Sequence, residues 1–240
     1  MTIRRIAAAV ALTLFFVAAQ ASAQSAQESN WGVSGSFVPS WTVPGDSALS
    51  KAMFGADALS INGSEFRIGF VRGRTLGGDW GVSFVRRKLK DGSTVSSGLY
   101  TDPEMPGLEQ GEFKTLRNVE LTGVEVHKFT PFGTIAKRVQ IGVLFGGGVA
   151  SSKGEIDMRT VSVDYRFTGN RMVMIPVETQ ETLDAKELVF PGNGLVALGR
   201  LEVAVAGIVA PGLKLRASGG MAFPGMHTFS IGGVYLIGAK

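Results

Sequence analysis

Charged side chains in this chain stand in the middle of apolar segments and at alternate positions. Glu65 and Arg67 flank Phe66, and Arg200 and Glu202 flank Leu201. Alternate residues of a strand share one face, so charges of both signs would face a common polar interior. Because an unpaired buried charge is costly, these residues should form ion pairs. The expected interior charge network is Glu65, Arg67, Arg87, Glu125 (or Glu120 in its place), Arg200, Glu202, Lys214 and Arg216.

Such a network has two possible uses. It could line a selective ion path or gate, or it could form a closed salt-bridge core that plugs the interior. An eight-stranded barrel has an interior just wide enough for side chains to fill it. We therefore predict the closed core, and a narrow channel or carrier for small or apolar solutes is the alternative.

Residues that could support catalysis do not share a face. A membrane-embedded acylhydrolase needs a Ser or Thr, a His and a carboxylate presented together. Glu125 and His127 share a parity, but no Ser follows two residues later, and His227 and Ser230 point in opposite directions. The two histidines are expected at opposite faces of the membrane, so they should not share a metal. No phosphate-binding glycine motif occurs. We predict no enzyme activity, no cofactor and no metal.

Alternation of apolar and polar residues defines the elements that would position these groups. In the clearest segment, Val139, Ile141, Val143 and Phe145 share one parity and Gln140 lies on the other. This period of two predicts strands with one apolar face. Within residues 118–129 the apolar parity switches at Gly123, where a β-bulge would restore a continuous face. Eight segments show the pattern: residues 31–41, 65–71, 80–87, 118–129, 139–150, 195–205, 213–223 and 228–237.

The connections between these segments differ in length on the two sides. Short connections at 75–79, 130–138 and 209–212 alternate with mostly long ones, such as 91–116 and 151–191. Short periplasmic turns and longer outer loops are typical of outer-membrane barrels. The sequence therefore predicts an all-β, antiparallel, up-and-down transmembrane β-barrel of eight strands. A soluble lipocalin-like barrel would turn the same apolar face inward.

The longest connection leaves the number of strands open. Residues 161–167 alternate, Thr168, Gly169 and Asn170 indicate a turn, and residues 171–178 could form a second strand. This hairpin could project above the membrane or cross it, which would give ten strands. Met172, Met174 and Pro176 weaken the alternation, so we expect eight.

Residues near the ends of the segments suggest contacts with the membrane surface. Interfacial aromatic girdles are typical of such barrels, and the candidates are Trp31, Trp41, Trp80, Phe229 and Tyr235. A basic run ends the third segment on the long-loop side, where phosphate groups of lipopolysaccharide would attract it. Its residues are Arg86, Lys88 and Lys90. A solvated strand end is the other interpretation of that run.

The N-terminal residues indicate export. Arg4 and Arg5 precede an apolar run from residue 6 to residue 19, and Ala21-Ser22-Ala23 forms a cleavage site. We expect a signal peptide at 1–23 and one barrel domain at 24–240. Without the two arginines the net charge of +4 becomes nearly neutral, and no basic stripe with aromatics suggests nucleic-acid binding. The chain has no cysteine, so a disulfide framework is excluded.

Two stretches carry a resemblance to a known family. Residues 64–70 (Ser-Glu-Phe-Arg-Ile-Gly-Phe) and 80–84 (Trp-Gly-Val-Ser-Phe), with the signal peptide and the alternating strands, resemble the bacterial outer-membrane β-barrel superfamily of small monomeric barrels. The resemblance implies a monomer in the outer membrane, in contact with lipid and lipopolysaccharide and inserted by the barrel-assembly machinery. It implies location more than activity. A structural or surface-interaction role is expected, with a channel as the alternative and a soluble periplasmic binding barrel as a third possibility.

Overall fold

The computed structural model describes residues 29–42, 58–101, 108–135, 138–169, 171–187, 195–223 and 226–238. The predicted signal peptide, residues 1–23, lies outside these ranges. Within them, no helix has the length and apolar character that crossing a membrane would require.

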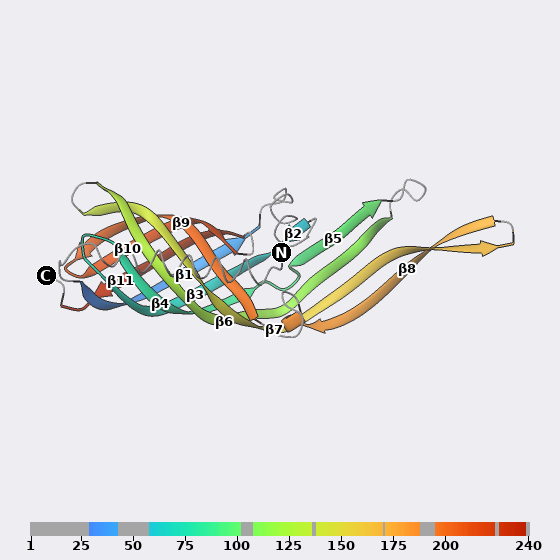
Figure 1. Ribbon diagram of the computed structural model, residues 1–240, viewed down its shortest axis with the longest axis horizontal. Helices are drawn as coiled ribbons and strands as arrows, with labels where there is room; N and C mark the ends of the chain where they lie inside the picture. Colours follow the sequence, from blue (N-terminus) through green and yellow to red (C-terminus); the bar gives the residue numbers. More distant parts are fainter. Residues whose placement is uncertain are drawn as a thin grey trace, which may run out of the picture.

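Eight strands of the described residues close into an antiparallel barrel (Figure 1). Their order around the barrel follows their order in the sequence, and β1 pairs with β11 to complete the ring, with Val33 opposite Tyr235. The prediction of an eight-stranded up-and-down barrel is confirmed. The strands are β1 (Asn30–Trp41), β3 (Asn62–Gly73), β4 (Asp79–Leu89), β6 (Glu109–Ile135), β7 (Val139–Thr168), β9 (Leu195–Ala210), β10 (Leu213–Ala222) and β11 (Met226–Leu236).

The apolar parity of these strands faces outward. Phe66 and Val203 are 54% and 59% exposed, whereas their sequence neighbours Glu65 and Glu202 are each only 1% exposed. β-Branched and aromatic side chains suit a pleated surface, and here they form a belt of the kind that contacts lipid hydrocarbon. A soluble lipocalin-like barrel would bury Phe66 and Val203 in a core, so that alternative is wrong.

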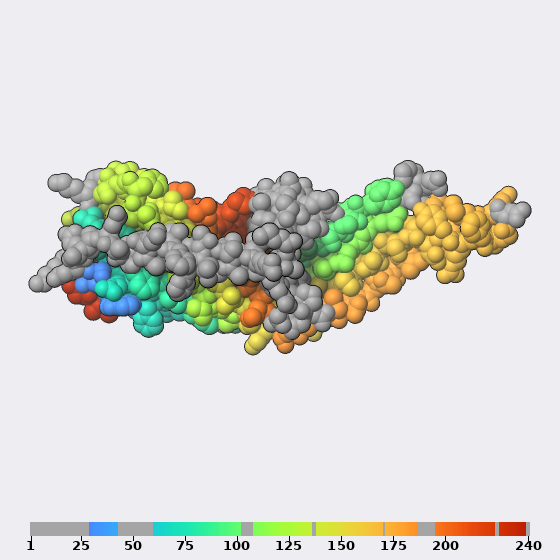
Figure 2. Space-filling view, viewed as in Figure 1, coloured from blue at the N-terminus to red at the C-terminus, as the bar shows by residue number. Residues whose placement is uncertain are grey.

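Two barrel strands continue well beyond the barrel at one end. β6 and β7 remain paired from Gly111 opposite Val161 to Arg117 opposite Glu155. β5 (Thr94–Thr101) pairs with β6, β8 (Arg171–Asp184) pairs with β7, and the short β2 (Ala58–Ser60) pairs with β5. A short 3-10 helix, η1 (Ala185–Glu187), follows β8. We call β5, β8 and residues 109–117 and 153–168 the β extension; it stands clear of the barrel in Figures 1 and 2.

The β extension corrects two expectations from the sequence. Residues 91–116 and 151–191 were expected to be long loops, but much of both stretches is strand. The hairpin of β7 and β8 projects beyond the barrel and does not join the ring, so the ten-stranded alternative is wrong for the described residues. Strand pairing satisfies backbone groups that a loop would leave to water.

The predicted β-bulge at Gly123 is absent. Pairing between β6 and β7 runs without a shift from Glu120 to Phe129, and the register shift lies earlier, beside Asn118, which has a φ of 48°. Val119 and Leu121 therefore point into the barrel and are buried. The apolar residues change parity along this strand because Val119 and Leu121 face the interior near one end of the barrel, whereas Val124 and Val126 face outward.

The other barrel end has the short connections. Between β9 and β10 the turn consists of Pro211 and Gly212, and Gly212 has a φ of 73°, which glycine adopts without a steric penalty. The start of β1 and the end of β11 meet at this end, where the Ile237 amide donates to the Trp31 carbonyl at 2.7 Å.

Candidate functional site

The barrel interior gathers the charged side chains of the described residues. The structure places all eight residues of the expected network there, each at most 9% exposed: Glu65, Arg67, Arg87, Glu125, Arg200, Glu202, Lys214 and Arg216. Glu120, the alternative to Glu125, lies instead on the outer surface, where it accepts hydrogen bonds from Arg86 at 2.8 and 2.9 Å. Asp79 is a ninth interior charge, 3% exposed.

Three arginines and three glutamates form a cluster in the middle of the barrel. Arg87 donates from Nε to Glu65 at 2.6 Å, and Arg67 also forms an ion pair with Glu65. Arg200 lies 2.8 Å from Glu125 and 3.5 Å from Glu202. Arg67 approaches Glu125 to 3.8 Å and so joins the two halves. This middle cluster contains equal numbers of the two signs.

Hydroxyl groups of β10 and β11 complete the environment of Glu202. Ser218 donates to one carboxylate oxygen at 2.7 Å, and Thr228 donates to the other at 2.9 Å. Ser218 also contacts Ser230. Hydrogen bonds from two neutral donors and an ion pair with Arg200 together compensate for removing Glu202 from water.

A second cluster lies toward the short-turn end. One carboxylate oxygen of Asp79, Oδ2, accepts hydrogen bonds from Lys214 Nζ at 2.9 Å and from Arg216 Nη2 at 2.6 Å. Lys214 also donates to the carbonyls of Arg74 and Gly77 in the turn between β3 and β4, at 2.8 and 3.3 Å. The Arg216 guanidinium lies 4.3 Å from the centroid of the Phe129 ring, a cation–π contact. One carboxylate therefore serves two cations here.

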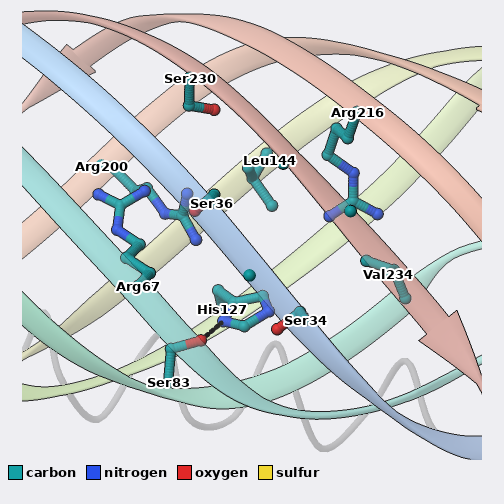
Figure 3. A pocket seen from close by; sticks show the side chains of 13 residues that line it. Ser34, Ser36, Arg67, Ser83, His127, Leu144, Arg200, Arg216, Ser230 and Val234 are labelled. Atoms are coloured by element: carbon teal, nitrogen blue, oxygen red, sulfur yellow. Dashed lines mark hydrogen bonds between the residues drawn. The ribbon is translucent and has the colours of Figure 1, made fainter.

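Apolar side chains enclose the charged interior at both ends. At the end that carries the β extension, the buried cluster comprises Ile61, Leu89, Leu116, Val119, Ile156, Ala185 and Met226. Toward the short-turn end, buried apolar residues are Val71, Phe129, Leu144, Ala204, Ala206, Val234 and Leu236. Between these layers a cavity of about 30 Å³ remains, lined by Arg67, Arg200, Arg216, His127 and several serines (Figure 3). It has room for one or two water molecules.

Gly146 fits between the charged groups of the middle cluster. A Cβ atom at this position would lie 2.8 Å from Glu125 Oε1 and 3.2 Å from Arg200 Nε. These two atoms belong to a buried, packed pair, so any side chain would push the carboxylate and the guanidinium from their places. Gly146 thus makes room for the two long charged side chains that face it.

Asp79 and His127 are interior residues that the sequence did not assign to the charge network. Asp79 was assigned to the preceding connection, although its parity matches that of Arg87 and is opposite to that of Trp80. That parity was the signal that could have identified it. His127 is 4% exposed and lies 3.4 Å from the Ser83 hydroxyl. Ser83 and His127 are on different strands, so a search for motifs within one segment does not pair them.

Ser83 and His127 are residue types that could act as a nucleophile and its base, but no space for a substrate adjoins them in the described part of the chain. Both side chains are buried, and the adjoining cavity of about 30 Å³ cannot hold an ester or lipid beside them. His227 lies on β11 at the opposite end of the barrel, facing Trp41 of β1. These positions give no support for an acyl-transfer site in the described residues.

The residues expected at the membrane surface lie on the outside of the barrel. Trp31 and Trp80 contact each other at the short-turn end, with ring centroids 6.2 Å apart, and Tyr235 lies on the same end of β11. Trp41 and Phe229 are on the outer face toward the other end. Arg86, Lys88 and Lys90 are exposed beside that end of β4. Across β6, Lys88 aligns with Glu120 and then with Lys153 of β7.

The β extension carries a groove and an apolar tip. The groove has a volume of about 570 Å³ and is lined by residues of β5 to β8, including Phe113, Arg117 and Arg159. Arg117 lies 2.5 Å from Asp157, and Arg159 lies 3.0 Å from Glu178. A hydrogen bond from Gln180, reinforced by Arg159, holds the pKa of Glu178 below its ordinary value.

The hairpin end of the β extension exposes large apolar side chains. Opposite residues of antiparallel strands share a face, so Tyr165 with Met174 and Phe167 with Met172 form one apolar surface. Phe167 is 78% exposed. Exposed apolar patches of this kind mark interaction surfaces.

Comparisons with known proteins found structural likeness only. No family model and no curated protein matches this sequence. Among solved structures, the chain is similar to Ail, the attachment invasion locus protein of Yersinia pestis, solved in complex with the heparin analogue sucrose octasulfate. The identity is 10%, the match covers 87% of this chain and 99% of Ail, and the TM-score is 0.34.

Two autotransporter structures show a weaker likeness. The β domain of the Bordetella autotransporter BrkA is 12% identical over 86% of this chain and 99% of that domain, with a TM-score of 0.31. The transport unit of AIDA-I from Escherichia coli is 8% identical over 89% of this chain and 91% of that unit, with a TM-score of 0.18. At such low scores, the fold is defined by this chain's own strand pairing and outward apolar belt.

Proposed function

We propose that this chain is a non-conducting anchor in the bacterial outer membrane that holds the β extension outside the cell for contacts with its surroundings. One observation carries the proposal. The barrel interior is filled by ion pairs between apolar layers, whereas the exposed groove and apolar tip lie on the β extension. The chain therefore has a structural and surface-interaction role.

We also propose how the chain reaches the outer membrane. The signal peptide at 1–23 directs export, and residues 24–240 form the mature barrel domain, a monomer inserted by the barrel-assembly machinery. The strands of a single chain close the barrel, and its outer face carries a complete apolar belt. Both features support insertion as a monomer. No cofactor, metal or nucleic acid takes part in this role.

The closed interior makes a sharp prediction in planar lipid bilayers. The purified chain should insert without unitary conductance steps, because the interior charges pair with one another and the remaining cavity of about 30 Å³ does not extend through the barrel. The measurement is single-channel recording in 1 M salt, a condition that reveals even narrow pores. Reproducible steps that disappear in Arg200→Gln or Glu202→Gln would instead establish the narrow-channel alternative.

We also propose that Arg86, Lys88 and Lys90 contact phosphate groups of lipopolysaccharide. These side chains are exposed on the outer surface at the end of the barrel that bears the β extension, and Lys153 lies two strands away at the same level. A basic residue near an anionic membrane surface contributes about 1 kcal/mol to binding. Arg86 already pairs with Glu120, so Lys88 and Lys90 carry most of the unbalanced charge.

Reversing the charge of Lys88 and Lys90 to Glu should weaken binding of lipopolysaccharide by roughly tenfold or more. Titration of lipopolysaccharide into the purified barrel, followed by its heat-unfolding temperature, measures this loss. The matched control reverses Arg166 and Arg171, which lie at the far tip of the β extension. If the Lys88 and Lys90 variant assembles and responds to lipopolysaccharide as the wild type does, the contact is refuted.

A further inference from the structure

Three arginines converge on the interior cavity from different strands. Arg67 of β3, Arg200 of β9 and Arg216 of β10 all line it, together with His127 and the hydroxyl groups of Ser34, Ser36, Ser83 and Ser230. In Figure 3, Arg67 and Arg200 lie on one side of the view and Arg216 on the other, with His127 between them. The wall therefore combines cationic and hydroxyl groups with apolar surface from residues such as Leu144 and Val234, and none of the described residues that line it is a carboxylate.

Two of these donors, Nε of Arg200 and Nε of Arg216, make no hydrogen bond with the described residues. Arg67 meets its neighbours through ion pairs, from Nε to Glu65 and from Nη2 to Glu125 at 3.8 Å, and its Nη1 makes no hydrogen bond. The buried oxygens Oε1 of Glu65, Oδ1 of Asp79 and Oε1 of Glu125 accept no hydrogen bond of normal geometry either. The Arg67 side chain is 2% exposed and the Arg200 side chain 4% exposed. Leaving a buried charged donor without an acceptor is costly, so these groups call for a partner in the cavity.

The charge of the interior is not balanced by the protein. The buried charged residues of the described chain are five cations (Arg67, Arg87, Arg200, Lys214 and Arg216) and four carboxylates (Glu65, Asp79, Glu125 and Glu202). The middle cluster contains three arginines and three glutamates, so its charges balance. The excess positive charge therefore belongs to Lys214 and Arg216, which both pair with Asp79. Arg216 also lines the cavity. One of the two cations that share Asp79 is thus located at the cavity wall, whereas Lys214 donates to carbonyl groups of the turn between β3 and β4.

We propose that this cavity binds one small monovalent inorganic anion of the size of chloride. A water molecule would satisfy donors but would leave a net buried charge, which is expensive in a low-dielectric interior. An anion satisfies the donors and neutralises the excess together. A space of about 30 Å³ accepts a single small ion, whereas gluconate and other large organic anions are too big to enter. The bound anion acts as a structural component of the closed barrel.

The first test compares unfolding in different sodium salts. The protein, purified from membranes in a nonionic detergent, is unfolded in sodium chloride, sodium bromide and sodium gluconate at equal ionic strength. Chloride and bromide should stabilise it with a saturating dependence, so that the folding equilibrium constant rises about 100-fold when the anion is at 100 times its Kd. Gluconate should show no such dependence. Identical curves in chloride and gluconate would overturn the proposal.

A pair of variants locates the effect. Arg216→Gln removes the excess charge and should abolish the difference between chloride and gluconate, whereas Arg86→Gln on the outer surface should retain it. If Arg216→Gln does not assemble, anomalous scattering from crystals of the unaltered protein grown in bromide decides the question. A bromide peak among Arg67, Arg200 and Arg216 is expected, and its absence there would overturn the proposal.

Discussion

Replacing Glu65 with glutamine should lower the free energy of unfolding by about 3–5 kcal/mol, the cost typical of breaking a buried ion pair by removing one partner. Glu65 is 1% exposed and accepts from Arg87 while also pairing with Arg67. The neutral amide would leave two buried guanidinium groups without their nearest negative charge. Equilibrium unfolding by urea in lipid vesicles, followed by tryptophan fluorescence, measures the loss.

The chain contains a matched control for this variant. Glu120 also forms a close pair with an arginine, Arg86, but the Arg86 side chain is 63% exposed. Solvated ion pairs contribute little to stability because water and salt screen them. Glu120→Gln should therefore leave the unfolding free energy almost unchanged. Equal effects of the two substitutions would mean that the interior is hydrated and would contradict the closed core.

Cysteine labelling at the tip of the β extension should give an all-or-none result in intact cells. The sequence has no cysteine, so a single introduced thiol reports only its own position. Phe167→Cys lies at the exposed tip of the hairpin, and a maleimide attached to a long polyethylene glycol should label nearly all of it, because the proposed anchor holds this tip outside the cell. Labelling is read as a mass shift on a gel.

Leu76→Cys is the matched control for the opposite side of the membrane. Leu76 is exposed in the turn between β3 and β4, at the barrel end away from the β extension. It should react only after the outer membrane has been opened. Labelling of Leu76→Cys but not Phe167→Cys in intact cells would reverse the orientation and refute display of the β extension outside the cell.

The two parts of the molecule have different physical tasks under this proposal. A barrel of eight strands has no room for a wide channel once its interior charges are paired, so it is suited to holding a position. The β extension is built from two of the same strands, β6 and β7, which pass without a break from the barrel into the exposed sheet. The backbone itself therefore connects the tip to the membrane anchor along two strands, whose pairing shifts register once, beside Asn118.

The sequence by itself determined which face each barrel residue occupies. Side chains alternate along a strand with a period of two, so the apolar parity of Phe66 and Val203 specified the outward face, and Glu65 and Glu202 had to point inward. It also indicated the number of barrel strands, because each crossing carries its own alternating segment. The same reasoning places Asp79 inside the barrel if the connection before it ends at residue 78 instead of residue 79.

Only the tertiary structure decided how far the strands extend and which charges meet. Alternation does not mark where a membrane ends, so the sequence indicated a hairpin within residues 151–191 but left open whether it projects or crosses, and residues 91–116 were expected to be a loop. Val119 and Leu121 suggested a bulge, but both point into the barrel and are buried there. Pairing of Arg200 with Glu125, and of Arg216 with Asp79, depends on the register and stagger of strands distant in sequence. Register and stagger determine the distances between side chains across the interior. The alternation of residues along a single strand carries no information about those distances.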